Sequence, residues 1–439
     1  MLSMKDSPYP WAQDDTIVYA DAGNPDNSLT RAQLATIVRR LAYSLRHELS
    51  VGASGTAKDV VTCFTSNHLL LPAIFYSVIG AGGIYSAASV SLTVPELARQ
   101  IQDSNSTIIV AGEDVAERAL EAAKLCKISP DRILILRSMG HSQALTPSID
   151  SSRDYFAQTM ELPWEKITDT QILETRVVAL LFSSGTTGVP KGVCLSHKNF
   201  VAEAIITQAA IGTYLDRAGR RIHVDFEYRA LAHLPAAHIS GLQGYFINGI
   251  MAGGTVFWMA KFVFEDLVRA AKAHRPTFIS TVPSVFLRIA KDNAVTNEFD
   301  SLEHAQSGAA PMGPELQRLA ESKLRCKISQ AWGMTETTGA ATWLPWDRVD
   351  DTGSISQLLP NMRLKIVDDD GNVVPDGHQG EILIRGPNIT QGYWNNPSAT
   401  AETFTFDGWL RTGDIGLHRD GKFYIVDRKK VCHLLPRRT

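Results

Sequence analysis

The feature that most constrains the fold is a series of short apolar runs that alternate with amphipathic stretches between about residues 60 and 289. Such near-continuous runs are typical of parallel strands, because helices then cover both faces of the sheet. The intervening stretches 115–126 and 264–274 carry apolar residues at helical spacing. The pattern predicts a mixed α/β protein of βαβ type with more than one sheet. The runs are 60–64, 107–110, 132–136 and 177–182.

The sequence pattern changes after about residue 361, where segments of alternating apolar and polar residues are joined by polar turns. The segments 363–367 and 381–385 read as strands, and 415–418 and 423–426 read as a hairpin around the Asp-Gly turn at 419–422. We therefore expect the chain to include a small antiparallel sheet or barrel near its end.

The segment 69–95 carries no charge and is long enough for a transmembrane helix. Pro72, Gly80 and the pair Gly82 and Gly83 interrupt it, and a serine-rich stretch follows. These residues favour a buried helix, a glycine turn and a strand, and we expect no membrane span.

The charge balance excludes a dedicated nucleic-acid binder, which needs a strongly basic face. Lys plus Arg total 43 and Asp plus Glu total 46, for a formal net charge of −3. The five cysteines lie far apart and show no metal-ligand spacing, which argues against a disulfide framework or a zinc site. Residues 1–11 lack the apolar core of a secretory signal, so we expect a cytoplasmic protein.

A glycine-rich loop follows the last of the apolar runs. Glycines let backbone amides converge on an anion, hydroxyls add donors, and Lys191 supplies a positive charge, which suits a polyphosphate. The spacing is not that of a Walker A loop, which excludes a P-loop kinase. A surface Ser/Gly turn remains the alternative from composition alone. The loop residues are Ser183, Ser184, Gly185, Thr186, Thr187, Gly188 and Lys191.

This run resembles the phosphate loop of the acyl-adenylate-forming superfamily, which includes acyl-CoA synthetases, 4-coumarate-CoA ligases, luciferases and peptide-synthetase adenylation domains. The stretch 330–339 resembles the second signature of the family, with Trp332 where Tyr is usual; both rings offer a flat face to adenine. The resemblance implies that Thr335 bonds a phosphate and that Glu336 binds the magnesium ion of the nucleotide. The remaining nucleotide-binding positions of this stretch are Gln330, Ala331, Gly333 and Met334.

Two later motifs complete the nucleotide site by resemblance. The stretch 409–414 resembles the ribose motif, in which Asp414 accepts bonds from both ribose hydroxyls. The stretch 427–430 resembles the hinge motif, in which Arg428 contacts the ribose. An Asp after Gly is also a common turn residue, so the resemblance carries this interpretation.

The acyl side rests on less specific matches. The stretch 233–242 resembles the family segment whose second histidine, His238, borders the carboxylate site, and a buried structural histidine is the alternative. The stretch 306–312 resembles the segment along the adenine and the acyl wall. Lys261 aligns with a residue that contacts the phosphate of coenzyme A. The expected wall is uncharged and suits an apolar acyl or aryl acid. Its residues are His238, Ile239, Leu242, Ser307, Gly308, Gly333 and Ala340, with Ala309 and Ala310 beside the adenine.

By this resemblance the protein is an ATP-dependent acid–thiol ligase that uses Mg²⁺ and coenzyme A. It forms an acyl-AMP from a fatty, aryl or polyketide-type acid, releases pyrophosphate, and transfers the acyl group to coenzyme A, as in fungal secondary metabolism. Lys191, Thr335, Glu336 and His238 are the expected catalytic residues. The implied fold is the large N-terminal domain of this family, over residues 1–427, with two stacked αβαβα sheets and a small β-barrel subdomain at about 362–427.

The match stops abruptly after Lys430, and residues 428–439 read as a hinge remnant and a tail foreign to the family. We expect the C-terminal lid domain, with its adenylation lysine, to be absent and catalysis to be impaired. Val431 and Cys432 can be encoded by a fungal intron donor, so intron read-through is one hypothesis and a cut chain the other.

Two other functions stay open. One is an adenylating domain that loads a carrier-protein thiol, and the other is a catalytically dead nucleotide- or acyl-binding remnant. Full-length relatives can carry a peroxisomal tripeptide at the C-terminus, which the ending Arg437-Arg438-Thr439 does not match.

Overall fold

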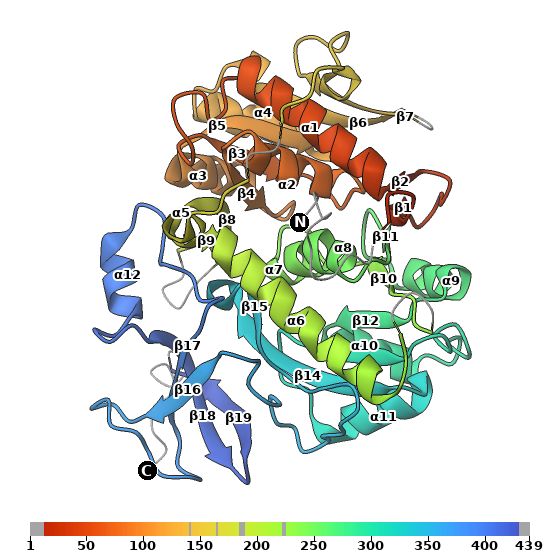
Figure 1. Cartoon of the computed structure of the whole chain (residues 1–439), viewed down its shortest axis with the longest axis vertical. Helices are drawn as coiled ribbons and strands as arrows, with labels where there is room; N and C mark the ends of the chain where they lie inside the picture. The colour runs from red at the N-terminus through yellow and green to blue at the C-terminus, as the bar shows by residue number, and fades with distance from the viewer. Residues whose placement is uncertain (1–12, 140–141, 164–165, 184–188, 222–224, 430–439) are drawn as a thin grey trace.

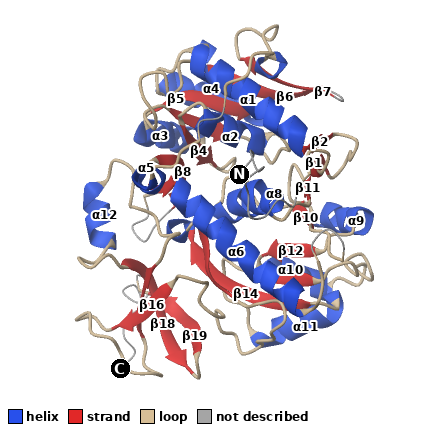
Figure 2. Ribbon diagram, in the orientation of Figure 1, coloured by secondary structure: helices blue, strands red, loops and turns tan. Residues whose placement is uncertain are grey.

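A computed structural model describes residues 13–139, 142–163, 166–183, 189–221 and 225–429. The large part of the molecule is built of helices packed on sheets, and the last sheet lies apart from it at the C-terminal end (Figures 1 and 2). A mixed α/β fold with more than one sheet is therefore confirmed.

The largest sheet has seven strands in the order β7-β6-β5-β3-β4-β8-β9, and strands β7 and β9 at its two edges run antiparallel to their neighbours. Alternate residues of its inner strands face opposite layers: Ile108 and Val110 pack in the core with α1 and α2, whereas Ile109 and Ala111 pack with α3 and α4. Both faces are covered, which explains the continuous apolar runs. The elements are α1 (Arg31–His47), β3 (Val60–Phe64), α2 (Leu71–Gly80), β4 (Ile84–Ala88), α3 (Val94–Ser104), β5 (Ser106–Gly112), α4 (Ala116–Leu125), β6 (Ile133–Met139), β7 (Ser142–Pro147), α5 (Thr170–Thr175), β8 (Val177–Ser183) and β9 (Lys191–Ser196).

Two four-stranded sheets form the middle of the molecule, in the orders β10-β11-β1-β2 and β12-β13-β14-β15. They meet where the N–H of Thr277 donates to the carbonyl of Arg229 over 2.9 Å. The long helix α6 (His197–Arg217) runs across this region in Figure 1. The other elements are β1 (Ile17–Asp21), β2 (Ser28–Thr30), β10 (Arg229–Ala232), α7 (Ile239–Gly241), the π-helix η5 (Leu242–Asn248), α8 (Gly249–Met251), β11 (Thr255–Trp258), α9 (Phe264–His274), β12 (Phe278–Thr281), α10 (Pro283–Lys291), β13 (His304–Ser307), α11 (Pro314–Leu324), β14 (Lys327–Met334) and β15 (Gly339–Trp343).

The C-terminal sheet is an antiparallel meander in the order β16-β17-β18-β19. Its first strand spans the segment expected from the sequence, and the hairpin around residues 419–422 is confirmed. The elements are β16 (Arg363–Val367), β17 (Gly380–Arg385), α12 (Pro397–Thr403), β18 (Leu410–Arg419) and β19 (Lys422–Arg428).

The uncharged segment 69–95 forms helix α2, a turn and strand β4, as the glycines and Pro72 predict. Its apolar side chains are buried in the protein core. Among the described residues no helix is both long and apolar enough to cross a membrane.

Candidate active site

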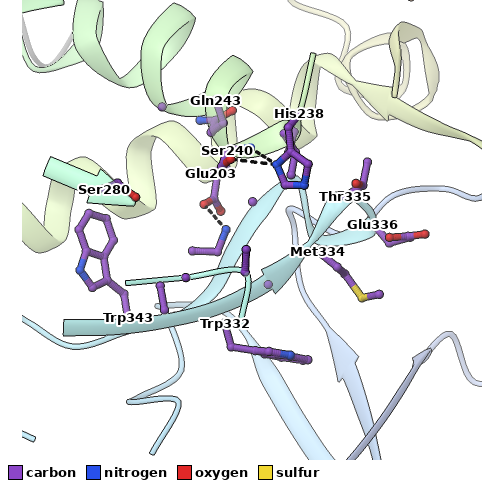
Figure 3. A pocket seen from close by; sticks show the side chains of 18 of the residues that line it. Glu203, His238, Ser240, Gln243, Ser280, Trp332, Met334, Thr335, Glu336 and Trp343 are labelled. Carbon is purple, nitrogen blue, oxygen red and sulfur yellow. Dashed lines mark hydrogen bonds between the residues drawn. The ribbon is translucent and has the colours of Figure 1, made fainter. Parts of the chain in front are cut away.

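A cavity of about 520 Å³ lies where the large sheet, the middle sheets and the C-terminal sheet meet. Its wall is contributed by β8 and β9, by α6 and the π-helix, by β14 and β15, and by the end of β19. Figure 3 shows Glu203, Gln243 and His238 on one side of strand β14 and Trp332 on the other, with Glu336 beyond the end of the strand. The cavity therefore has two ends separated by β14.

A tight turn between β14 and β15 presents Thr335 and Glu336 to the cavity. Thr338 and Gly339 adopt positive φ angles of 58° and 129°, and Met334 pairs with Gly339 across the turn. At Gly333 a Cβ atom would lie 1.8 Å from the carbonyl oxygen of Gly339. This approach is open to glycine alone, so the sequence of the second motif is dictated by backbone geometry as well as by chemistry.

Glu336 is held by two hydroxyl groups at the side of the cavity where β8 ends and β9 begins. Its Oε1 accepts hydrogen bonds from Ser183 Oγ and Tyr393 Oη, each over 3.0 Å. Lys191 Nζ lies 5.1 Å from the centre of the Tyr393 ring, within range of a cation–π interaction. Ser183 and Lys191 pair across the β8–β9 hairpin, so the two residues lie side by side, Ser183 bonded to Glu336 and Lys191 beside the Tyr393 ring.

Tyr393 was not singled out from the sequence. It lies in a loop that pairs with β9: Cys194 N–H donates to Gly392 O over 2.9 Å, and Trp394 N–H donates to Gly192 O over 2.7 Å. Burial and the neighbouring Glu336 carboxylate raise the pKa of Tyr393, so its hydroxyl stays protonated and donates. The available signal was the Gly-Tyr-Trp run in a polar segment.

Trp332 and Arg428 both bond Asp414, one to each carboxylate oxygen. The indole Nε1 donates to Oδ2 over 2.9 Å, and Arg428 Nε lies 2.8 Å from Oδ1. Asp414 is buried behind these two residues, which line the cavity. The three residues come from β14, β18 and β19, so the distant motifs are brought together.

The two histidines of the 233–242 stretch have different roles. His233 is buried, with Nδ1 bonded to Leu231 O and Nε2 to Thr281 Oγ1, and burial lowers its pKa to about 4. His238 lines the cavity, and its Nδ1 lies 3.2 Å from the backbone nitrogen of Ser240. That N–H can only donate, so Nδ1 accepts and the proton of the neutral ring is on Nε2. Burial lowers the pKa of His238, which favours this neutral donor form.

The other end of the cavity carries polar side chains that the expected wall did not include. Glu203, Gln208 and Gln243 line it, together with Thr207 and Asn248. They come from α6 and from the π-helix, a form that often marks functional sites. The π-helix backbone is stabilised by two tyrosines, since Tyr19 and Tyr76 donate to the carbonyl of Phe246 over 2.8 and 3.0 Å. No local sequence signal had indicated this wall.

The structure brings most of the predicted residues to this one cavity. Those at the cavity wall are Ser183, Lys191, His238, Ile239, Gly308, Ala309, Ala331, Trp332, Gly333, Met334, Thr335, Glu336, Ala340 and Arg428.

Six predicted residues do not line the cavity. Asp414 lies behind it, Leu242 and Ser307 are buried in the core, and Lys261 and Ala310 are exposed. Gln330 bonds the backbone of Met312 at 3.2 and 3.0 Å. The loop residues Ser184, Gly185, Thr186, Thr187 and Gly188 and the tail from Lys430 lie outside the described residues.

Comparison with known proteins agrees with this geometry. A family model described as AMP-binding enzyme matches residues 10–394. A protein of Emericella nidulans, named provisionally as an acyl-coenzyme A synthetase, is 49% identical over 95% of this chain and 74% of its own length. A phenylacetyl-CoA ligase of Aspergillus niger is 32% identical over 94% of this chain and 75% of its own length.

Solved structures share the fold. ATP-bound MatB from Rhodopseudomonas palustris matches with a TM-score of 0.79 and 24% identity, over 97% of this chain and 77% of that one. The AMP complex of O-succinylbenzoate coenzyme A synthetase from Bacillus subtilis matches with a TM-score of 0.76 and 22% identity, over 98% and 78%. The chain thus spans about three quarters of the length of these proteins.

Proposed function

Because the chain belongs to the AMP-binding enzyme family, whose matched relatives are acyl-CoA ligases and synthetases, we propose that it is an ATP-dependent acyl-CoA ligase. In the proposed reaction a carboxylate oxygen attacks the α-phosphorus of ATP and pyrophosphate leaves. The sulfur of coenzyme A then attacks the acyl carbon, forming a thioester and releasing AMP. The observation that carries the proposal is one cavity that joins the Trp332–Asp414–Arg428 group to the Glu336–Lys191 group.

The nucleotide would occupy the side of β14 that holds Trp332. The Asp414 carboxylate is an acceptor, and two ribose hydroxyls can replace the donors that it binds in this structure. The indole of Trp332 offers an apolar face to a purine. Arg428 would then bond the ribose or a phosphate.

The phosphates would lie near the ends of the glycine-rich loop. Lys191 supplies a cation there, and Glu336 supplies carboxylate oxygens of the kind that Mg²⁺ prefers. The described residues contain no cluster of three or more His, Cys, Asp or Glu side chains able to hold a metal. A single Glu therefore fits Mg²⁺ best as an ion bound mainly by the phosphates, whose negative charge it would offset.

The acid would occupy the His238 side. The Nε2–H of His238 can donate to the carboxylate oxygen that does not attack, which orients the attacking oxygen. A neutral donor also holds the acid without forming an ion pair that would reduce its nucleophilicity. Lys261 remains proposed as a contact for a phosphate of coenzyme A, and a role in fungal secondary metabolism remains a proposal; the relatives cited above support only the fungal part of it.

The test is acid-dependent release of pyrophosphate, measured with ATP and Mg²⁺ over a panel of medium-chain, aryl and hydroxy acids, with hydroxylamine to trap the acyl-AMP. A hydroxamate that forms only with a particular acid supports the proposal. Binding of ATP with no hydroxamate from any acid, even in a fusion to the C-terminal domain of a relative, would refute it.

A further inference from the structure

The acyl end of the cavity contains three buried polar side chains that the proposed reaction does not use. Glu203, Gln208 and Gln243 are 1%, 1% and 3% exposed, and all three line the cavity. Buried polar groups in proteins are normally hydrogen-bonded, so a donor or acceptor atom without a partner points to a missing ligand group.

Both glutamines use their donors and leave their acceptors unpaired. Gln208 Nε2 donates to the backbone carbonyl of Asn248 over 3.3 Å, and this partner can only accept, which fixes the amide orientation. Gln243 Nε2 donates to Asn248 Oδ1 over 3.1 Å. The Oε1 atoms of both glutamines are buried and have no partner among the described residues. Two amide oxygens at this wall thus lack donors.

Glu203 adds a third acceptor to the same place. Its Oε1 accepts from Ala340 N–H over 3.0 Å and its Oε2 accepts from Asn388 Nδ2 over 2.8 Å. Burial raises the pKa of this carboxyl group to about 8, so it is protonated near neutral pH, and its carbonyl oxygen retains a further lone pair. A Cβ atom at Gly339 would lie 3.1 Å from Glu203 Oε1 and 3.7 Å from Gln243 Cγ. The two side chains therefore converge on Gly339, where the absence of a side chain keeps the space open.

We propose that the acid activated by this protein carries a hydrogen-bond donor, a hydroxyl or an amino group, on its acyl chain, and that Glu203, Gln208 and Gln243 pair with it. This inference rests on the proposed function. The terminal torsion of glutamine is soft, so a small rotation turns each amide oxygen toward the ligand. A purely hydrocarbon acid would leave the Oε1 atoms of Gln208 and Gln243 unsatisfied in a dry site, which is disfavoured.

Glu203 is the residue that distinguishes the two donors. A hydroxyl needs an acceptor of any charge, and the amide oxygen of a glutamine serves as well as a carboxyl group. An ammonium group needs a negative charge beside it, because an isolated cation is costly to bury, and it would therefore bind the ionised form of Glu203. Glu203→Gln should therefore weaken binding of an acyl chain that bears an amino group and leave binding of an acyl chain that bears a hydroxyl unchanged.

The probes are acyl-sulfamoyl adenosines, which join an acyl chain to adenosine without reacting. Saturated chains of four, six and eight heavy atoms are each compared with chains whose terminal methyl is replaced by a hydroxyl or an amino group. Dissociation constants are measured by calorimetry on the wild-type chain. We expect a donor-bearing probe to bind about 10-fold tighter or more than its methyl partner for at least one length.

Two variants test whether the glutamines of this wall cause the preference for a donor-bearing probe. Gln208→Met and Gln243→Met keep the side-chain volume and remove the unpaired acceptor, and each should shrink the preference about 10-fold, while Gln102→Met on the exposed side of α3 should not change it. The wild-type comparison needs no variant and stands even if one of them fails to fold.

The outcomes separate this inference from the proposed function. If methyl probes bind tighter at every length, or if a donor preference survives both methionine variants, the inference is wrong while the proposed function stands. If no probe binds more tightly than adenosine sulfamate, the proposed function fails as well.

Discussion

The two ends of the cavity differ in how the sequence encodes them. At the proposed nucleotide end, Trp332, Glu336 and Asp414 each belong to a contiguous motif, and each is hydrogen-bonded to a residue from another motif. At the acyl end, Glu203 and Gln243 come from a helix and a π-helix with no motif, and their acceptors are partly unpaired. Under the proposed function, the end that would bind the invariant nucleotide is encoded in contiguous motifs, whereas the end that would select among acids is assembled from distant side chains.

The largest expected effect is at Gly333, where strand β14 separates the two ends. In Gly333→Ala the new Cβ would lie 1.8 Å from Gly339 O, so the β14–β15 turn must move and both ends should be lost together. We expect a loss of about 3 kcal/mol or more in the free energy of unfolding, measured by denaturant titration. Gly313→Ala is the control, because no atom lies within 4 Å of its Cβ position. If the two variants are equally stable, the β14–β15 turn accommodates the new methyl group and the prediction is wrong.

Asp414→Asn should damage the nucleotide end alone. The change replaces an acceptor of two charged or polar donors, Arg428 and Trp332, by a neutral amide. We expect affinity for ATP to fall about 100-fold by calorimetry, since bonds to a charged group are worth about 1.5–3 kcal/mol. The control Asp376→Asn changes an exposed carboxylate in the same part of the molecule. Unchanged affinity for ATP would show that Asp414 does not contribute to nucleotide binding.

Glu203 should give the acyl end a pH-dependent stability. Burial raises its pKa to about 8, so the folded protein holds a proton that the unfolded chain has lost above its ordinary carboxyl pKa. Stability is therefore fully present at low pH and falls as the pH rises toward 8, by about 1.4 kcal/mol per unit at most.

The measurement is the free energy of unfolding at about pH 6 and about pH 7.5, with an expected fall of roughly 2 kcal/mol from this group. The fall with pH should be smaller by this amount in Glu203→Gln, and it should be unchanged in Glu121→Gln on helix α4. Parallel pH profiles for wild type and Glu203→Gln would contradict the buried proton.

The smallest effect is expected from Tyr393→Phe. It removes one of the two hydroxyl donors to Glu336 and keeps the ring near Lys191. We expect a fall of about 10-fold in pyrophosphate release, with affinity for the acid unchanged. A change in acid selectivity with no change in rate would place Tyr393 at the wrong end.

The mixed α/β fold could be predicted from the sequence because its signals are local, and most of the motif residues do meet at one cavity. The apolar run 60–64 is β3, and Trp332 and Glu336 do line the cavity. Tyr393 was missed because only its loop pairing with β9 brings it to Glu336. Glu203 was missed because its burial depends on Asn388, 185 positions away, and a polar residue in a helix normally faces solvent.

The central claim is that one cavity binds adenylate at one end and an acyl chain at the other. Calorimetry can compare three ligands: an acyl-sulfamoyl adenosine, adenosine sulfamate and the free acid. If both halves sit in one cavity, the joined ligand gains an intramolecular advantage and should bind at least about 100-fold tighter than either half. An acyl-sulfamoyl adenosine that binds no tighter than adenosine sulfamate, for every acyl chain of the panel, would contradict the account.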